Sequence, residues 1–110
     1  MSKPIKINFE FTDGQSHDAS VSEISDAIEI CYNYNWSLAP NAIGLDADPT
    51  YTIEVSNNNI DWASYETPTL DAAIDQPFDD IHFAWLFVRI NYNAVANTTG
   101  TVEFNLVFKT

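Results

Sequence analysis

The chain has very few basic residues. Its four cations are Lys3, Lys6, Arg89 and Lys109, against sixteen acidic residues, and the formal net charge is −12. A nucleic-acid-binding surface needs several Lys or Arg side chains on one face to neutralise phosphates, so this class is excluded. An anionic membrane surface would repel the chain for the same reason. The acidity either keeps the protein soluble or serves docking onto a basic partner surface or cation binding.

Cysteine and long apolar runs are also scarce. Cys31 is the single cysteine, so no internal disulfide can form, and one cysteine with two histidines does not indicate a Cys/His zinc site. No apolar run approaches the ~20 residues of a membrane span, and residues 1–7 lack the apolar segment of a signal peptide. We expect a protein made in a cytoplasm, without a cofactor. The glycosylation sequons at Asn35 and Asn97 are then interpreted as chance matches.

The residues that are present alternate between apolar and polar over much of the chain. At 110 residues we expect a single domain, residues 1–110, which is long enough to bury one core. Residues 5–11 and 51–56 show the period of two that is typical of a strand with one buried face. Residues 17–21 are expected to form a short second strand. This periodicity predicts a sheet protein.

The middle of the first half is less regular. Residues 21–30 fit either a helical turn, because cap-like serines and acids open them, or a strand. The longest alternation covers residues 27–37, and we expect one long strand there. Residues 38–49 contain two prolines and a glycine, so they are expected to form a loop.

The second half reads as a series of strands. An Asn-rich turn at residues 57–59 leads to a returning strand at 60–65, because Asn tolerates left-handed backbone conformations. Residues 67–80 are expected to be a loop between sheets. Residues 84–92 carry bulky side chains on both faces, which indicates a central strand, and residues 101–108 alternate again. The pattern predicts an all-β fold: an antiparallel β-sandwich, jelly-roll-like, with seven to eight strands and little helix.

Residues that could carry chemistry do not form a recognised motif. His17 and Asp18 could pair as a base and its orienting carboxylate, but no nucleophile motif accompanies them, so we expect an exposed turn histidine. Asp46 and Asp48 are the candidate Ca²⁺ ligands, although they lack the spacing of a known calcium loop. A similar acidic group without defined spacing is Asp79, Asp80 and His82. We therefore expect no metal and no enzyme; a small enzyme would instead need a polar pocket around one of the two histidines.

Aromatic side chains gather on the strand expected at residues 27–37. Tyr32, Tyr34 and Trp36 would share one face of it. This stripe is either the core face, which its alternation with Asn and Glu favours, or a flat platform for sugar rings. Trp62 is likewise interpreted as a core or interface residue, and as a sugar-binding residue under the second interpretation.

Arg89 is the only arginine and lies within an otherwise apolar strand. We expect it to pair with an acid on a neighbouring strand, either Glu54 or Glu103. A role in binding a partner is the alternative.

Part of the sequence resembles small structural proteins of tailed bacteriophages. Residues 51–62 read Tyr-Thr-Ile-Glu-Val-Ser-Asn-Asn-Asn-Ile-Asp-Trp, where those proteins have a strand ending in Val-Ser-Asn-Asp-Gly and then an aromatic residue. The resemblance continues through Phe-Val-Arg-Ile-Asn-Tyr at 87–92, Thr-Gly-Thr-Val at 99–102 and the terminal Phe-Lys. It covers residues 51–110. The turn departs from the pattern, because Asn58-Asn59 replaces Asp-Gly, but its turn chemistry is kept.

This resemblance implies a virion component: a capsid decoration, head-fibre, neck or tail-associated subunit. Such a subunit would bind viral capsid or tail proteins and its own copies as a homo-oligomer. Because aromatic residues and Arg are enriched at interface hot spots, the expected contact residues are Tyr65, Trp85, Phe87 and Arg89. The alternative is a carbohydrate-binding module of β-sandwich type. Its sugar-binding residues would be Tyr32, Tyr34, Trp36 and Trp62.

Overall fold

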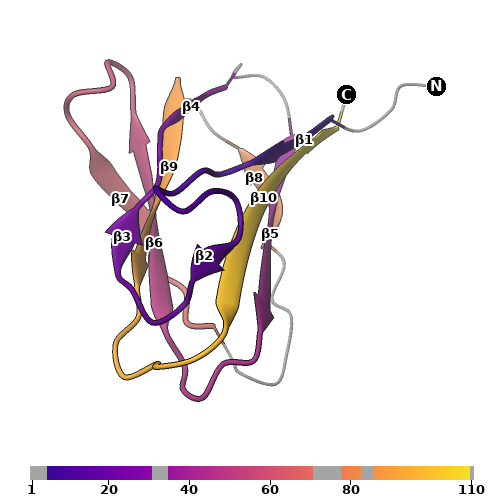
Figure 1. The fold of residues 1–110 in the computed structure, drawn as a ribbon. Coiled ribbons are helices and arrows are strands. Elements are labelled where there is room, and N and C mark those ends of the chain that lie inside the picture. Colours follow the sequence, from indigo (N-terminus) through magenta and orange to yellow (C-terminus); the bar gives the residue numbers. More distant parts are fainter. Residues whose placement is uncertain (1–4, 31–34, 71–77, 83–85, 110) are drawn as a thin grey trace.

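Two stacked β-sheets make up the protein in the computed structural model, which describes residues 5–30, 35–70, 78–82 and 86–109 (Figure 1). The described residues contain no helix long and apolar enough to cross a membrane. The strands are β1 (Ile5–Asn8), β2 (His17–Asp18), β3 (Glu23–Ile24), β4 (Ile28–Glu29), β5 (Asn35–Ile43), β6 (Thr50–Ser56), β7 (Ala63–Glu66), β8 (Phe78–His82), β9 (Phe87–Asn93) and β10 (Thr101–Lys109).

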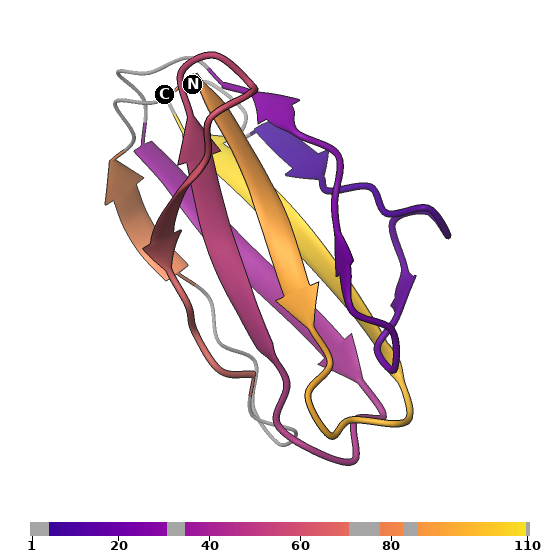
Figure 2. The same cartoon turned by 90° about the vertical axis from the view of Figure 1, so that its left-hand side faces the viewer.

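The strands pair in a nested order. One sheet runs β1-β10-β5-β8, with β2 also on β10, and the other runs β3-β9-β6-β7, with β4 also on β9. Every pair is antiparallel. Strands from the two ends of the chain lie side by side, as in a jelly roll. Figure 2 shows β7 and β8 at one lateral edge, and the short N-terminal strands at the other. The predicted all-β antiparallel sandwich is confirmed, but the described residues form ten strands where seven to eight were expected.

The core lies between the sheets because their strands alternate as a half-buried sheet requires. The inward side chains of β6 and β9 are almost wholly buried, while the residues between them are partly exposed. Phe104 on β10 is at the centre of a ring cluster, with centroids 4.9 Å from Tyr51 and 6.2 Å from Phe11 and Tyr92. These three long strands therefore hold most of the packed interior. The buried residues they contribute are Tyr51, Ile53, Val55, Val88, Ile90, Tyr92, Val102, Phe104 and Leu106.

Two expectations about the chain between residues 27 and 49 are wrong. The expected long strand at 27–37 is broken, because β4 ends at Glu29 and β5 begins at Asn35, with residues 31–34 outside the described part. The first half of the expected loop at 38–49 is strand, since β5 extends to Ile43 in register with β10, and only residues 44–49 form a loop. Pro40 is tolerated there because β8 pairs with β5 only as far as Leu38 in the described residues, which leaves one side of the strand open at the proline.

The second half follows the sequence more closely. Asn59 has φ 61°, so the Asn-rich turn is confirmed, although the returning strand begins only at Ala63. The expected loop at 67–80 is cut short by β8, which begins at Phe78. The strand expected at 84–92 is described as β9, and its central position between β3, β4 and β6 is confirmed.

Candidate functional site

An aromatic and charged patch covers the outer face of the sheet that contains β6 and β9. Arg89 on β9 lies opposite Glu54 on β6, and its Nε donates to Glu54 Oε1 at 2.7 Å. The amide of Asn91 donates to the other carboxylate oxygen of Glu54 at 3.2 Å. The guanidinium carbon lies 4.0 Å from the centroid of the Trp62 ring. We refer to these four residues as the Trp62–Arg89 patch; of the two acids predicted for Arg89, Glu54 is its partner.

The contacts of this patch fix the arginine in one orientation. Its side chain is 25% exposed and that of Glu54 is 14% exposed, so the pair is only partly hydrated. A planar guanidinium can donate to a carboxylate with its edge while its face stacks on an aromatic ring. Because Arg89 makes both contacts at once, its guanidinium is held between Glu54 and the Trp62 ring. Ordered Trp and Arg side chains on a surface are typical of protein-binding hot spots.

Next to the patch, β7 is the last strand of its sheet among the described residues. Strand β7 pairs with β6, and all four of its residues are exposed. Tyr65 on this strand is 44% exposed and Ile60 in the preceding turn is 78% exposed. The end strand of a sheet has one row of backbone donors and acceptors outside its own ladder, and another chain can pair with it. Edge and patch together form a continuous candidate contact surface.

The structure brings most of the expected interface residues to this region. Phe87 is half-buried on β9, two residues before Arg89 and therefore on the same face, and Tyr65 is on β7. Trp85 lies outside the described residues.

The expected sugar-binding aromatics are not brought to one surface by the described strands. Trp36 is in β5 of the other sheet, whereas Trp62 directly precedes β7 and contacts Arg89. Tyr32 and Tyr34 lie outside the described residues, and the side chain of Trp36 is not described.

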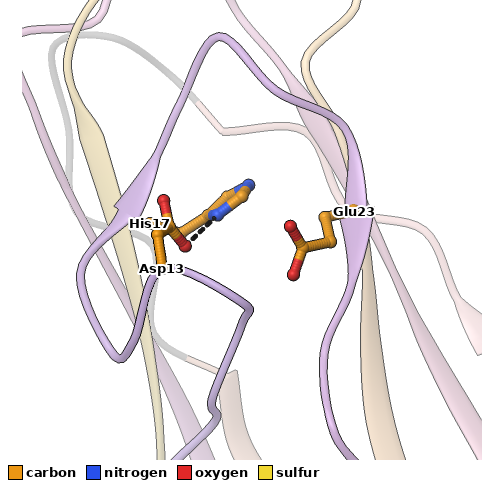
Figure 3. Close-up of side chains that lie close together, drawn as sticks. All are labelled: Asp13, His17 and Glu23. Atoms are coloured by element: carbon orange, nitrogen blue, oxygen red, sulfur yellow. Dashed lines mark hydrogen bonds and ion pairs between the residues drawn. The ribbon is translucent and has the colours of Figure 1, made fainter.

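His17 differs from the sequence expectation. It is 1% exposed, so the expectation of an exposed turn histidine is wrong. Its Nδ1 lies 2.7 Å from Asp13 Oδ1 (Figure 3). Its Nε2 lies 2.7 Å from the Val21 carbonyl oxygen, and its ring stacks on Phe11. The expected partner Asp18 instead accepts hydrogen bonds from Ser20, and Asp13 is the carboxylate hydrogen-bonded to the ring. Asp13 is the partner of His17 because the tight turn after β1 reverses the chain and brings the two residues together.

Glu23 faces the same histidine from the start of the other sheet. Its two oxygens accept from the backbone N–H and the hydroxyl of Thr12, at 2.6 and 2.7 Å. One ligand-type atom from each of Asp13, His17 and Glu23 lies within 4.8 Å of the others (Figure 3). Burial alone would raise the pKa of Asp13, but hydrogen bonds from the Asp18 backbone and His17 outweigh it and lower that pKa. Sequence reasoning missed this cluster, because spacings of four and six residues match no motif.

In the acidic loop that contains Asp46 and Asp48, the side chain of Asp46 has a structural role. Its carboxylate accepts hydrogen bonds from both the backbone N–H and the hydroxyl of Thr98. The hydrogen bond from the Thr98 hydroxyl is the main cause that lowers the pKa of Asp46. This carboxylate thus ties the loop after β5 to the loop before β10. Asp79, Asp80 and His82 lie in β8, and their side chains are not described.

Because of the hydrogen bonds of Asp46, we expect the free energy of unfolding to depend on pH in the acid range. Since the pKa of Asp46 is lower in the folded chain than in the unfolded one, its contribution is complete above the unfolded value, about 3.9. The contribution is lost as the pH falls through the lowered folded value. Urea midpoints of the wild type and Asp46→Asn should differ more at pH 7 than at pH 3. An equal difference at both pH values would show that the ionised form is not what Thr98 stabilises.

The fold has a counterpart among known structures. No protein-family model matches the sequence, and no curated protein matches it either. The crystal structure of the SPBc2 prophage-derived protein YomS is similar, with a TM-score of 0.62 and 13% sequence identity. The match covers 99% of this chain and 97% of that one. At this identity the likeness concerns the fold, and it extends over nearly the whole of both chains.

Proposed function

We propose that the protein is a non-enzymatic structural component of a bacteriophage particle that acts by binding other proteins. The observation that carries this proposal is the fold shared along nearly the full length of a prophage-derived protein. The position in the particle would be that of a capsid decoration, head-fibre, neck or tail-associated subunit.

The proposed contact surface is the β7 edge together with the Trp62–Arg89 patch. Tyr65 offers an exposed ring on β7, and Arg89 offers an oriented guanidinium on β9 of the same sheet. With a net charge of −12, the chain fits a basic surface of a capsid or tail protein. Copies of the chain repel one another through the same charge, so a homo-oligomer would need pairing along strand edges. Repeated copies on a particle would then add their weak contacts together.

Particles from the strain that encodes the chain provide the test. We expect mass spectrometry of purified, induced particles to find the protein in a fixed copy number. Its absence from particles, while it is present in the lysate, would reject the proposal.

Variants supplied to a strain that lacks the gene test the surface. Tyr65→Ala and Arg89→Ala should lower the copy number by about tenfold or more, as expected at hot spots. The matched control is Ile43→Ala, because Ile43 is 66% exposed on β5 of the other sheet. This variant should be incorporated into particles like the wild type. Equal incorporation of all three variants would place the contact surface elsewhere, even if the protein is in the particle.

Carbohydrate binding is a second candidate, favoured by one observation. Arg89 stacks on the Trp62 ring and is hydrogen-bonded to Glu54, which also accepts from Asn91. Polar groups near an aromatic ring can hydrogen-bond sugar hydroxyls. A glycan array would then give a signal that Trp62→Ala abolishes while the fold, followed by circular dichroism, is retained. No signal from the wild type would remove this candidate.

A further inference from the structure

We propose that Asp13, His17 and Glu23 form a binding site for a divalent transition-metal ion, with Zn²⁺ as the expected occupant. The inference is independent of the proposed function. It rests on three ligand-type side chains whose donor atoms lie within 4.8 Å of one another (Figure 3). One is a histidine that is 1% exposed.

The orientation of His17 is that of a metal ligand. Its Nε2 must donate, because the Val21 carbonyl oxygen 2.7 Å away can only accept. A histidine that binds a metal through one nitrogen commonly donates from the other nitrogen to a backbone carbonyl, which fixes its ring and tautomer. Nδ1 is thereby left as the metal-binding atom. It points at Asp13, the first carboxylate of the cluster.

The contact between Nδ1 and Asp13 requires a positive charge between the two atoms. In the neutral tautomer with hydrogen on Nε2, Nδ1 carries a lone pair, and that lone pair would face a carboxylate oxygen only 2.7 Å away. A proton on Nδ1 removes the repulsion and yields an imidazolium. A metal ion bound to both atoms removes it as well, once the two atoms move apart from hydrogen-bond distance to admit the ion.

The neighbours of the two carboxylates complete the site. The backbone N–H of Asp18 donates to Asp13 Oδ2 at 2.8 Å, and Thr12 donates to both oxygens of Glu23. Carboxylates that bind metals are in turn held by hydrogen bonds of this kind. Each carboxylate oxygen retains lone-pair capacity for an ion. The orienting contacts of a metal site are thus in place around all three ligands.

The donor set selects the class of ion. One imidazole nitrogen with two carboxylates suits Zn²⁺ and related transition metals, while Ca²⁺ and Mg²⁺ prefer oxygen ligands alone. Three protein ligands leave one tetrahedral position for water.

The position in the fold gives the ion a structural consequence. His17 is in β2, which pairs with β10, and Glu23 is in β3, which pairs with β9. A bound ion would therefore join the two sheets at one end of the sandwich.

The test is a zinc titration of the chelator-treated full chain by calorimetry and by dialysis with metal analysis. We expect one Zn²⁺ per chain, and binding at least tenfold weaker in both Asp13→Asn and Glu23→Gln. Glu29→Gln removes an exposed acid of β4 and is the matched control, expected to bind like the wild type. Because His17 is buried and its substitution could unfold the chain, the two carboxylate variants carry the test. Excess Mg²⁺ should not displace the zinc.

Two outcomes would overturn the proposal. One is the absence of a saturable site, in which case the cluster holds a proton and not a metal. The other is equal weakening by Glu29→Gln, which would show general attraction to an acidic surface. The nitrogen resonances of His17 give a second readout: zinc should shift Nδ1 strongly and leave Nε2 protonated.

Discussion

Replacing Gly100 by alanine is expected to lower the free energy of unfolding by about 3–5 kcal/mol. Gly100 has φ +90°, which L side chains rarely adopt. A Cβ on it would lie 2.3 Å from the Ile43 carbonyl oxygen and 2.7 Å from the carbonyl carbon and oxygen of Gly44. All three atoms belong to the backbone, so no side chain can rotate away, and the ends of β5 and β10 must separate. Urea unfolding followed by circular dichroism measures the loss.

Gly14 provides the matched control. It also has positive φ, +103°, but nothing lies within 4 Å of the position of its Cβ. Gly14→Ala should therefore show only the backbone cost, about 1–2 kcal/mol. The difference between the two variants isolates the clash at the β5 and β10 ends. Equal losses would mean that the chain relaxes at Gly100 and that the close approach there carries no stability.

Replacing Asn97 by alanine is the second large effect, a loss of about 2–4 kcal/mol. Its side chain is 3% exposed and makes four hydrogen bonds. The amide nitrogen donates to the carbonyl oxygens of Ala19 and Thr99, at 3.0 and 2.7 Å. The amide oxygen accepts from the backbone N–H groups of Asp46 and Ala47, at 3.0 and 3.1 Å. Alanine would leave these groups without their partner near the core.

The control for Asn97 is Asn41→Ala. Asn41 is exposed on β5, so its replacement should change the free energy of unfolding by no more than about 0.5 kcal/mol. Denaturant midpoints at equal slopes compare the two variants directly. If Asn97→Ala were as mild as the control, water would have to replace all four hydrogen bonds. The same burial explains why the sequon at Asn97 is not a surface acceptor in the folded chain.

The sequence predicts strands well where the alternation is unbroken. Residues 51–56 and 101–108 coincide closely with β6 and β10, because their inward residues form the core. The alternation failed as a guide at residues 38–43, where Pro40 suggests a loop. Pro40 fits within β5 because, in the described residues, that strand is unpaired on one side at the proline. This depends on the registers with β10 and β8, which single-sequence reasoning does not supply.

The contacts of the candidate sites could likewise be predicted only in part, because they too depend on how strands pair and the chain returns. The pairing of Arg89 with Glu54 could be predicted, since both lie in recognisable strands and their charges are opposite. The contact of Arg89 with Trp62 depends on how the hairpin returns, which the spacing does not fix. The contact of His17 with Asp13 and its closeness to Glu23 depend on a turn and on both sheets. Tertiary contacts of this kind leave no periodic signal.

The nested strand order dictates when this protein can fold during synthesis. β1 pairs with β10, so the first strand of the chain has no partner in its ladder until the last strand has left the ribosome. β3 likewise cannot form its pairing with β9 until β9 has been synthesised. The β6–β7 hairpin is the local exception and can form early. We therefore expect slow folding, because these pairings join strands far apart in the sequence. Apolar strands such as β5 stay exposed until β10 is available, open to capture by chaperones or by each other.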